Sequence, residues 1–174
     1  MLTLQPITPA VAAAFKAVRL NALLDSPSAF GSTHSKEVQL SDTDWQDRAA
    51  QWNSNRSIGY LAISGHDACG IAASFLDSAD PTMAHMDSMW VAPAHRGRGV
   101  GKQLVNAILD WARSKHAQTL CLMVTSNNEV ALRFYQRLGF VRTGKTEPYP
   151  NDPALVEYEM VRPIGPGENR SDFV

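Results

Sequence analysis

Hydrophobic positions in the first half of the chain follow two different periods. One series of four apolar residues recurs every three or four positions and predicts a helix with one buried face. Its members are Val11, Phe15, Val18 and Ala22. A short strand over residues 2–7 is expected before this helix, and Ser41 or Asp42 can cap a second one. Between residues 57 and 76 the period is two, with turn residues at 64–67, which predicts a hairpin of two strands.

The second half of the chain predicts strands and helices in alternation. We expect a strand over residues 83–91, and alternation places every second side chain of a strand on one face. That face is predicted to carry His85, Asp87, Met89 and Val91. Residues 120–124 form a continuous apolar run between two helical stripes. Such a run is typical of a strand buried on both faces and paired in parallel through a crossover helix.

Two further signals lie near the end of the chain. Ser126 and Glu129 fit a capping box for the helix that crosses residues 131–138. Glu157 and Glu159 alternate with apolar residues. The last strand is therefore predicted to be half-exposed and to lie toward an edge of the sheet.

Length and charge narrow the class of protein. The 174 residues, 44% hydrophobic and 19% charged, fit one globular domain, which we expect over residues 1–162 with a loose tail over 163–174. A net charge of -1 disfavours a nucleic-acid or membrane partner. Cys69 and Cys121 lie far apart in apolar runs, which favours buried thiols in a reducing cytoplasm over a metal site or a disulfide. No signal peptide or membrane span is predicted.

The sequence Arg96-Gly97-Arg98-Gly99-Val100-Gly101 lies between a predicted strand and an amphipathic helix. Glycines let backbone N–H groups turn toward a phosphate, and a helix N-terminus adds roughly half a positive charge. Lys102 adds a further cation. A P-loop would carry Ser or Thr where Gln103 stands, and the glycine spacing differs from that of a dinucleotide fingerprint. We therefore predict a phosphate-binding loop of another kind.

This loop resembles the Arg/Gln-x-x-Gly-x-Gly/Ala signature of the GNAT superfamily of acyl-CoA-dependent N-acetyltransferases, through Arg96, Gly99 and Gly101. A second block resembles that family's Asn-x-x-Ala…Tyr…Gly-Phe pattern; it consists of Asn128-Glu129-Val130-Ala131, Tyr135 and Gly139-Phe140. The resemblance implies an α/β fold with a mixed, mostly antiparallel sheet and helices on both faces. It also implies one parallel pair of strands, at residues 83–91 and 120–124.

The same resemblance implies acetyl-CoA as the cosubstrate, with no metal ion. It implies that backbone groups of Met89, Trp90 and Val91 bind the pantetheine arm, and that Asn128 contacts this arm from the other side. The pyrophosphate is then expected at Arg96, Gly97, Arg98, Gly99, Val100, Gly101 and Lys102.

Tyr135 is implied as the general acid. When an amine attacks the acetyl carbonyl, a thiolate of pKa about 8.5 leaves, and a nearby phenol can protonate its sulfur. The structural alternative for Tyr135 is a role in core packing. An alkylamine of pKa about 10 must lose a proton before it attacks. His85 or Asp87 is expected to be the base, directly or through water, since the glutamate often found there in the resembled family is missing from this strand.

We predict transfer to a primary amine of a small molecule by direct attack in a ternary complex. The balanced charge disfavours a basic peptide acceptor. A peptide or protein amine, and a non-catalytic CoA-binding module, are the alternatives. The resemblance places the acceptor near residues 26–52 and 145–153, with Phe30 and Tyr149 as candidate substrate-binding residues. The sequence leaves the acceptor's identity, the base and a homodimer open.

Overall fold

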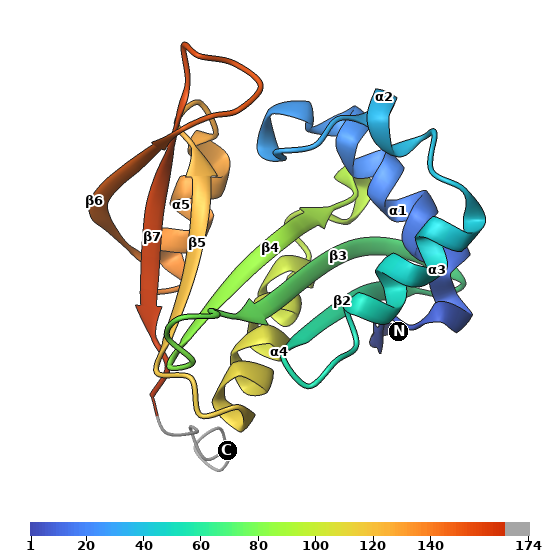
Figure 1. Ribbon diagram of the computed structural model, residues 1–174, viewed down its shortest axis with the longest axis horizontal. Coiled ribbons are helices and arrows are strands. Elements are labelled where there is room, and N and C mark those ends of the chain that lie inside the picture. Colours follow the sequence, from blue (N-terminus) through green and yellow to red (C-terminus); the bar gives the residue numbers. More distant parts are fainter. Residues whose placement is uncertain (166–174) are drawn as a thin grey trace.

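Seven strands form one mixed sheet in the order β1-β2-β3-β4-β5-β7-β6, within residues 1–165, the part of the chain that the computed structural model describes (Figure 1). The strands are β1 (Leu2–Pro6), β2 (Ser57–Ser64), β3 (Asp67–Leu76), β4 (Met83–Val91), β5 (Thr119–Thr125), β6 (Val141–Pro148) and β7 (Val156–Pro163). Neighbouring strands are antiparallel except β4 and β5, which are parallel as predicted.

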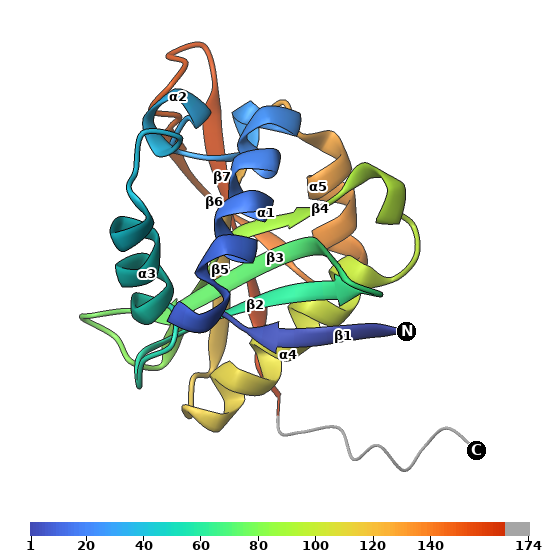
Figure 2. The same cartoon turned by 90° about the vertical axis from the view of Figure 1, so that its right-hand side faces the viewer.

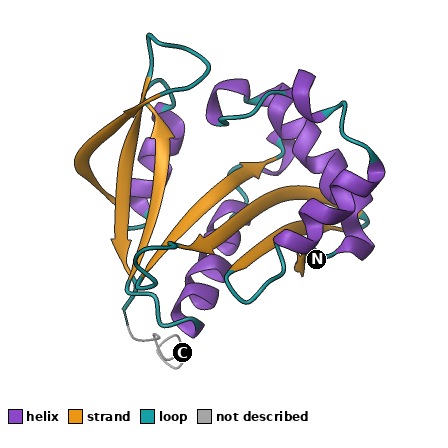
Figure 3. Ribbon diagram, viewed as in Figure 1, coloured by secondary structure: helices purple, strands orange, loops and turns teal. Residues whose placement is uncertain are grey.

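Helices cover both faces of this sheet, as Figures 2 and 3 show. The helices are α1 (Ala12–Asp25), α2 (His34–Glu37), α3 (Asp42–Gln51), α4 (Val100–Ser114) and α5 (Glu129–Arg137), with short 3-10 helices η1 (Pro9–Val11), η2 (Pro27–Ala29) and η3 (Pro93–His95). We call the side that carries α1 and α3 the α1 face and the side that carries α4 and α5 the α4 face. The predicted fold class is confirmed.

Each face of the sheet has its own hydrophobic core. On the α4 face, the helical stripe of α4 packs with Met86 of β4, Leu122 of β5 and Met160 of β7. On the α1 face, the predicted stripe of α1 packs with Leu61 of β2 and Ile71 of β3. Alternate residues of one strand therefore belong to different cores, as the two-residue period requires.

Two local predictions are wrong. The last strand, β7, lies between β5 and β6 instead of toward an edge, because β6 forms a hairpin with β7 and takes the outer position. The predicted capping box at Ser126 is also absent. The Ser126 amide donates to the Val156 carbonyl at 2.7 Å, which keeps Ser126 with the strands. The helix starts later, and the side chain of Asn128 accepts from the Ala131 amide at 3.1 Å.

The described chain ends after β7. Ile164 donates to the Gln118 carbonyl at 2.8 Å, and Arg113 donates to the Gly165 carbonyl at 2.9 Å. The remainder of the predicted tail, residues 166–174, lies outside the described residues. Within residues 1–165, no helix combines the length and the apolar character needed to cross a membrane.

Candidate active site

Strands β4 and β5 pair only over Met83–His85 and Thr119–Cys121. Beyond this point they diverge, and the sheet opens as a V (Figure 1). A cavity of about 290 Å³ lies in this opening. Its lining includes the predicted residues Phe30, His85, Asp87, Met89, Asn128 and Tyr135. Past the paired segment, the backbone groups of β4 that face the opening are not used by β5, so they are available to a bound molecule.

A bulge in β4 changes which side chains enter this opening. Ile71 of β3 pairs with Trp90, whereas Ala73 pairs with Asp87, so β4 has one extra residue against β3. Ser88 accommodates this residue with a left-handed φ of 56°. The prediction of one shared face for His85, Asp87, Met89 and Val91 is therefore wrong. His85 and Asp87 lie on the α1 face, whereas Met89 and Val91 pack in the α4-face core.

The predicted phosphate loop lies at the start of α4. Gly97 and Gly99 have φ values of 72° and 81°, a backbone region that residues with a Cβ rarely adopt. The first backbone hydrogen bond into the helix runs from Gln103 to the Gly99 carbonyl, at 3.0 Å. The amides of residues 100–102 therefore have no helical partner and can donate to an anion. The Val100 side chain itself is buried in the α4-face core.

The three cations of this loop differ in their contacts. Arg96 donates to the Val91 carbonyl at 2.9 Å and binds the carboxylate of Asp25. Trp90 donates to the same carboxylate at 2.9 Å. Arg98 and Lys102 are exposed, and within residues 1–165 neither forms an ion pair. Arg98 and Lys102 are thus the cations available to a phosphate, whereas Arg96 holds the end of β4 against the end of α1.

Tyr135 reaches the opening from the α4 face. It is 7% exposed and packs edge-on against Phe134 and Phe140. Burial, and secondarily the charge of Asp87, raise the pKa of the Tyr135 phenol well above its usual value. The phenol is therefore fully protonated at neutral pH, which is the form that a general acid needs, and it is a weaker acid than a free tyrosine.

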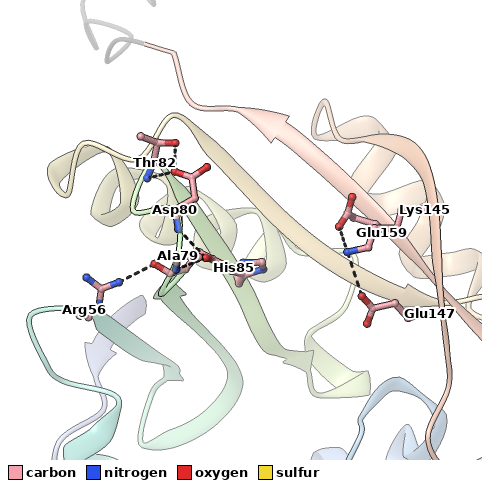
Figure 4. Close-up of polar contacts among 9 residues, drawn as sticks. Arg56, Ala79, Asp80, Thr82, His85, Lys145, Glu147 and Glu159 are labelled. Carbon is pink, nitrogen blue, oxygen red and sulfur yellow. Dashed lines mark hydrogen bonds and ion pairs between the residues drawn. The ribbon is translucent and has the colours of Figure 1, made fainter.

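Glu157 of β7 lines the same cavity, opposite Asp87. Burial, with the charges of Glu147 and Asp87, raises the pKa of the Glu157 carboxyl. Glu147 and Glu159 share the ammonium of Lys145, at 3.3 Å each (Figure 4). Among residues 1–165, Asp87 and Glu157 have no such cation. Sequence analysis missed Glu157 because alternation alone placed it on an exposed strand near an edge.

His85 is held by hydrogen bonding and stacking. Its Nε2 lies 2.9 Å from Asp77 in the β3–β4 turn, and its ring stacks on Phe75 at 5.1 Å between centroids. Figure 4 shows His85 beside this turn, where Asp80 also lies. Hydrogen bonds lower the pKa of the Asp77 carboxyl to about 2; the largest effect comes from the Asp80 amide, followed by His85 and the Ala79 amide. A carboxylate that binds Nε2 leaves Nδ1 as the nitrogen able to accept a proton.

Hydrogen bonds from Tyr149 and from Thr125 at the end of β5 to residues 27–30 join the two arms of the V. The Tyr149 hydroxyl donates to the carbonyls of Phe30 at 2.8 Å and Pro27 at 3.1 Å. The Thr125 hydroxyl donates to the Ser28 carbonyl at 2.7 Å. Of the two predicted substrate-binding residues, Phe30 lines the cavity, whereas the Tyr149 side chain is buried and its hydroxyl is used by this loop contact.

Both cysteines are free thiols buried in the structure. Burial, and secondarily the charge of Glu159, raise the pKa of the Cys121 thiol to about 11. Burial likewise raises the pKa of the Cys69 thiol. Neither thiol is ionised at neutral pH, so neither is suited to act as a nucleophile.

Comparison with known proteins identifies the family. The profile described as the acetyltransferase (GNAT) family matches residues 21–140. The chain belongs to the GNAT family. It is an acetyltransferase that uses acetyl-CoA. The free amides at the start of α4 and the open edge of β4 fit such a cosubstrate, since its pyrophosphate is anionic and its pantetheine arm carries amides.

The relatives of this GNAT enzyme carry names that describe different acetyltransferase activities. N-alpha-acetyltransferase RimI of Mycobacterium tuberculosis is 33% identical over 112 residues, 64% of this chain and 68% of that protein. L-methionine sulfoximine/L-methionine sulfone acetyltransferase of Salmonella typhimurium is 30% identical over 112 residues, 60% of this chain and 63% of that protein. The chain thus spans about two thirds of the length of these relatives. Salmonella typhimurium yncA, solved with its cofactor acetyl-CoA, shares the fold with a TM-score of 0.74 and 17% identity over 99% of both chains.

Proposed function

We propose that this GNAT enzyme transfers the acetyl group of acetyl-CoA to a primary amine of a small molecule by direct attack in a ternary complex. The proposal rests on one arrangement. Tyr135 approaches the opening between β4 and β5 from the α4 face, whereas Asp87 and Glu157 approach it from the α1 face. A proton donor and two proton acceptors thus lie on opposite sides of the place where a thioester fits.

On the donor side, the amides of residues 100–102, with Arg98 and Lys102, would hold the pyrophosphate. The open backbone of β4 at Met89 and Trp90 would bind the pantetheine arm, and the Asn128 amide would contact it from the other side of the cavity. The Val91 carbonyl already accepts a hydrogen bond from Arg96, so Val91 has fewer backbone groups than Met89 and Trp90 for binding the pantetheine arm. Bound acetyl-CoA supplies the activated acetyl group.

On the acceptor side, Asp87 and Glu157 would attract the ammonium form of the amine and take up its proton. Glu157 is the first candidate for the base, because burial and the charges of Glu147 and Asp87 raise the pKa of its carboxyl. Tyr135 would then protonate the leaving sulfur. His85 is the alternative base through Nδ1, since Asp77 binds Nε2.

Access to the cavity favours a small acceptor over a protein. The hydrogen bonds of Tyr149 and Thr125 to residues 28–30 join the two arms of the V. A protein amine is the second candidate, which the likeness to N-alpha-acetyltransferase RimI supports. An extended polypeptide, however, would need the loops at residues 27–31 and 148–151 to separate.

The test is the rate of thiol release from acetyl-CoA with small amines, polyamines and peptides as acceptors. We expect turnover with at least one small amine and none with peptides. Turnover on peptides alone would overturn the small-molecule assignment, and CoA binding without turnover on any acceptor would overturn the whole proposal.

The base is tested with Glu157→Gln, Asp87→Asn and His85→Asn, and with Asp47→Asn on α3 as a distant control. Loss of a general base lowers kcat by about 10²–10⁴-fold. We expect this loss, with a displaced acidic limb of the pH profile, in Glu157→Gln. The same result in His85→Asn, with Glu157→Gln active, would assign the base to His85 instead.

A further inference from the structure

A second cavity, of about 610 Å³, lies on the α1 face and adjoins the first. Phe30, Gly31, Phe75, Asp87 and Ser88 line both cavities. A molecule can therefore extend from the opening between β4 and β5 into the space beneath α1 and α3. Arg19, Glu37 and Arg48 also line this space, and they do not line the first cavity.

These three residues leave an excess of positive charge. Glu37 is 2% exposed, and both of its oxygens accept from Arg19, at 2.9 and 3.1 Å. Arg48 lies 3.1 Å from the same carboxylate. Burial raises the pKa of Glu37, but the hydrogen bonds and charge of Arg19, with smaller contributions from Ser32 and Arg48, outweigh it and keep the pKa below its usual value. Two guanidinium groups thus share one carboxylate.

Arg48 has capacity for another anion. Its guanidinium contacts Glu37 through one terminal nitrogen, and its side chain is 38% exposed at the cavity. A guanidinium carries five N–H donors, and a second carboxylate is the group that such a planar fork binds best. The Arg48 side chain is also placed over the Trp45 ring, at 5.4 Å, which fixes its direction.

The adjoining first cavity carries the negative groups: Asp87 lines both cavities, and Glu157 lines the first one. Asp87 and Glu157 have no cation partner among residues 1–165. Arg19 donates to the Ser88 hydroxyl at 3.2 Å, and Ser88 directly follows Asp87 in the chain. Through this contact the Arg19 guanidinium lies close to Asp87, so the cationic and the acidic groups can contact adjacent charged groups of one small molecule. The second cavity also has an aromatic wall, which includes Phe15, Phe30, Trp52 and Phe75.

From this polarity we infer that the acceptor is a free α-amino acid with an apolar side chain. Its ammonium group lies at Asp87 and Glu157, its carboxylate at Arg48 and Arg19, and its side chain against the aromatic wall. A substrate with both charges complements the acidic and the cationic groups. An amine without a carboxylate leaves the remaining N–H donors of Arg48 without an anion. This inference rests on the proposed transfer to a small amine and specifies its acceptor.

The experiment compares three acceptors that differ only at the carboxylate: phenylalanine, phenylalaninamide and phenethylamine. The amine of the amide is the least basic of the three, so chemical reactivity alone favours the amide at neutral pH. We expect phenylalanine to have the highest kcat/KM, by about tenfold or more, as a hydrogen-bonded ion pair predicts.

The matched variant is Arg48→Gln, which leaves Glu37 paired with Arg19 and so preserves the buried ion pair. We expect its KM for phenylalanine to rise about tenfold or more, and the preference for phenylalanine over phenethylamine to fall by the same factor, because phenethylamine has no group that the guanidinium could bind. Arg133→Gln is the control, since Arg133 is exposed on α5 and pairs with Glu129 at 2.9 Å. An unchanged Tm and an unchanged affinity for CoA verify that Arg48→Gln is folded.

The outcomes separate this inference from the proposed function. Equal or better turnover of phenethylamine or phenylalaninamide would overturn the amino-acid assignment and leave the transfer to a small amine standing. Turnover of polyamines without turnover of any of the three probes would do the same. Absence of turnover with every small amine, despite CoA binding, would overturn the proposed function itself.

Discussion

The carboxylate of Asp25 at the end of α1 binds the guanidinium of Arg96 at the start of the phosphate loop. The same carboxylate accepts a hydrogen bond from the Trp90 indole at 2.9 Å. Burial raises the pKa of Asp25, but the hydrogen bonds from Trp90, Ser26 and Arg96 outweigh it and hold the pKa below its usual value. The end of β4 is thereby attached to α1, which forms part of the acceptor cavity.

This contact predicts different roles for the three cations of the loop. Arg98→Gln and Lys102→Gln should weaken CoA binding and reduce its salt dependence, because both side chains are exposed and unpaired among residues 1–165. Arg96→Gln should lower stability by about 1 kcal/mol or less, since the pair is partly exposed. Calorimetric titration with CoA at low and high salt measures the affinity and its salt dependence, and thermal unfolding measures the stability. A salt dependence reduced by Arg96→Gln but not by the other two variants would contradict this division.

The left-handed backbone at Ser88 predicts a strong dependence on side-chain branching. Ser88→Val places a β-branched residue at a φ of 56°, at a cost of roughly 1–2 kcal/mol, or forces the bulge to shift and turns Asp87 away from the cavity. Ser88→Gly accepts this backbone and loses the same hydrogen bond to Arg19. We expect Ser88→Val to lose thermal stability and turnover relative to Ser88→Gly. Equal activity of the two variants would rule out a role for the bulge.

The phosphate loop was predictable from sequence because its determinants are local. Three glycines and three cations adjoin a helical stripe, and the structure places Gly97 and Gly99 in the conformations that favour glycine. The two hydrophobic periods likewise predicted the helices and strands that carry the site. Local sequence thus contains most of the information on the donor side.

The acceptor side depends on contacts between distant segments. Ser88 carries no turn signal, so the bulge that separates Asp87 from Met89 could not be read from alternation. β7 pairs with β5 on one side, and β6 takes the outer position on the other. Only this pairing brings Glu157 to the cavity. Arg19, Glu37 and Arg48 come from three helices and meet only after folding. No local pattern marks any of these residues.

The pKa of Asp77 predicts a specific dependence of stability on pH. Its folded value, about 2, lies below the ordinary value of 3.8. A lowered pKa means that the ionised carboxyl stabilises the fold above pH 3.8, and that this stabilisation is lost as the pH falls toward 2. Asp77→Asn should therefore lower Tm at pH 6, and the difference from the wild type should shrink below pH 4. Asp47→Asn is the control. A difference in Tm that is constant from pH 6 to pH 2 would show that Asp77 does not act through its charge.

Tyr135→Phe separates chemistry from packing at the centre of the site. The hydroxyl has no protein partner among residues 1–165, whereas the ring packs against Phe134 and Phe140. Removal of the hydroxyl alone should therefore leave Tm and the affinity for CoA unchanged. If the phenol protonates the leaving sulfur, kcat should fall by about 10²–10⁴-fold. Steady-state thiol release, with CoA titration on the same sample, measures both quantities.

The pH dependence of this assay distinguishes proton transfer by Tyr135 from positioning of the substrate. A thiol leaving group with a low pKa needs no proton from Tyr135, whereas the thiolate of CoA, with a pKa of about 8.5, does at neutral pH. The loss in Tyr135→Phe should therefore diminish as the pH rises above about 8.5, where the free thiolate is stable in water. A loss that is the same at pH 7 and pH 9.5 would indicate that the hydroxyl positions the substrate and transfers no proton.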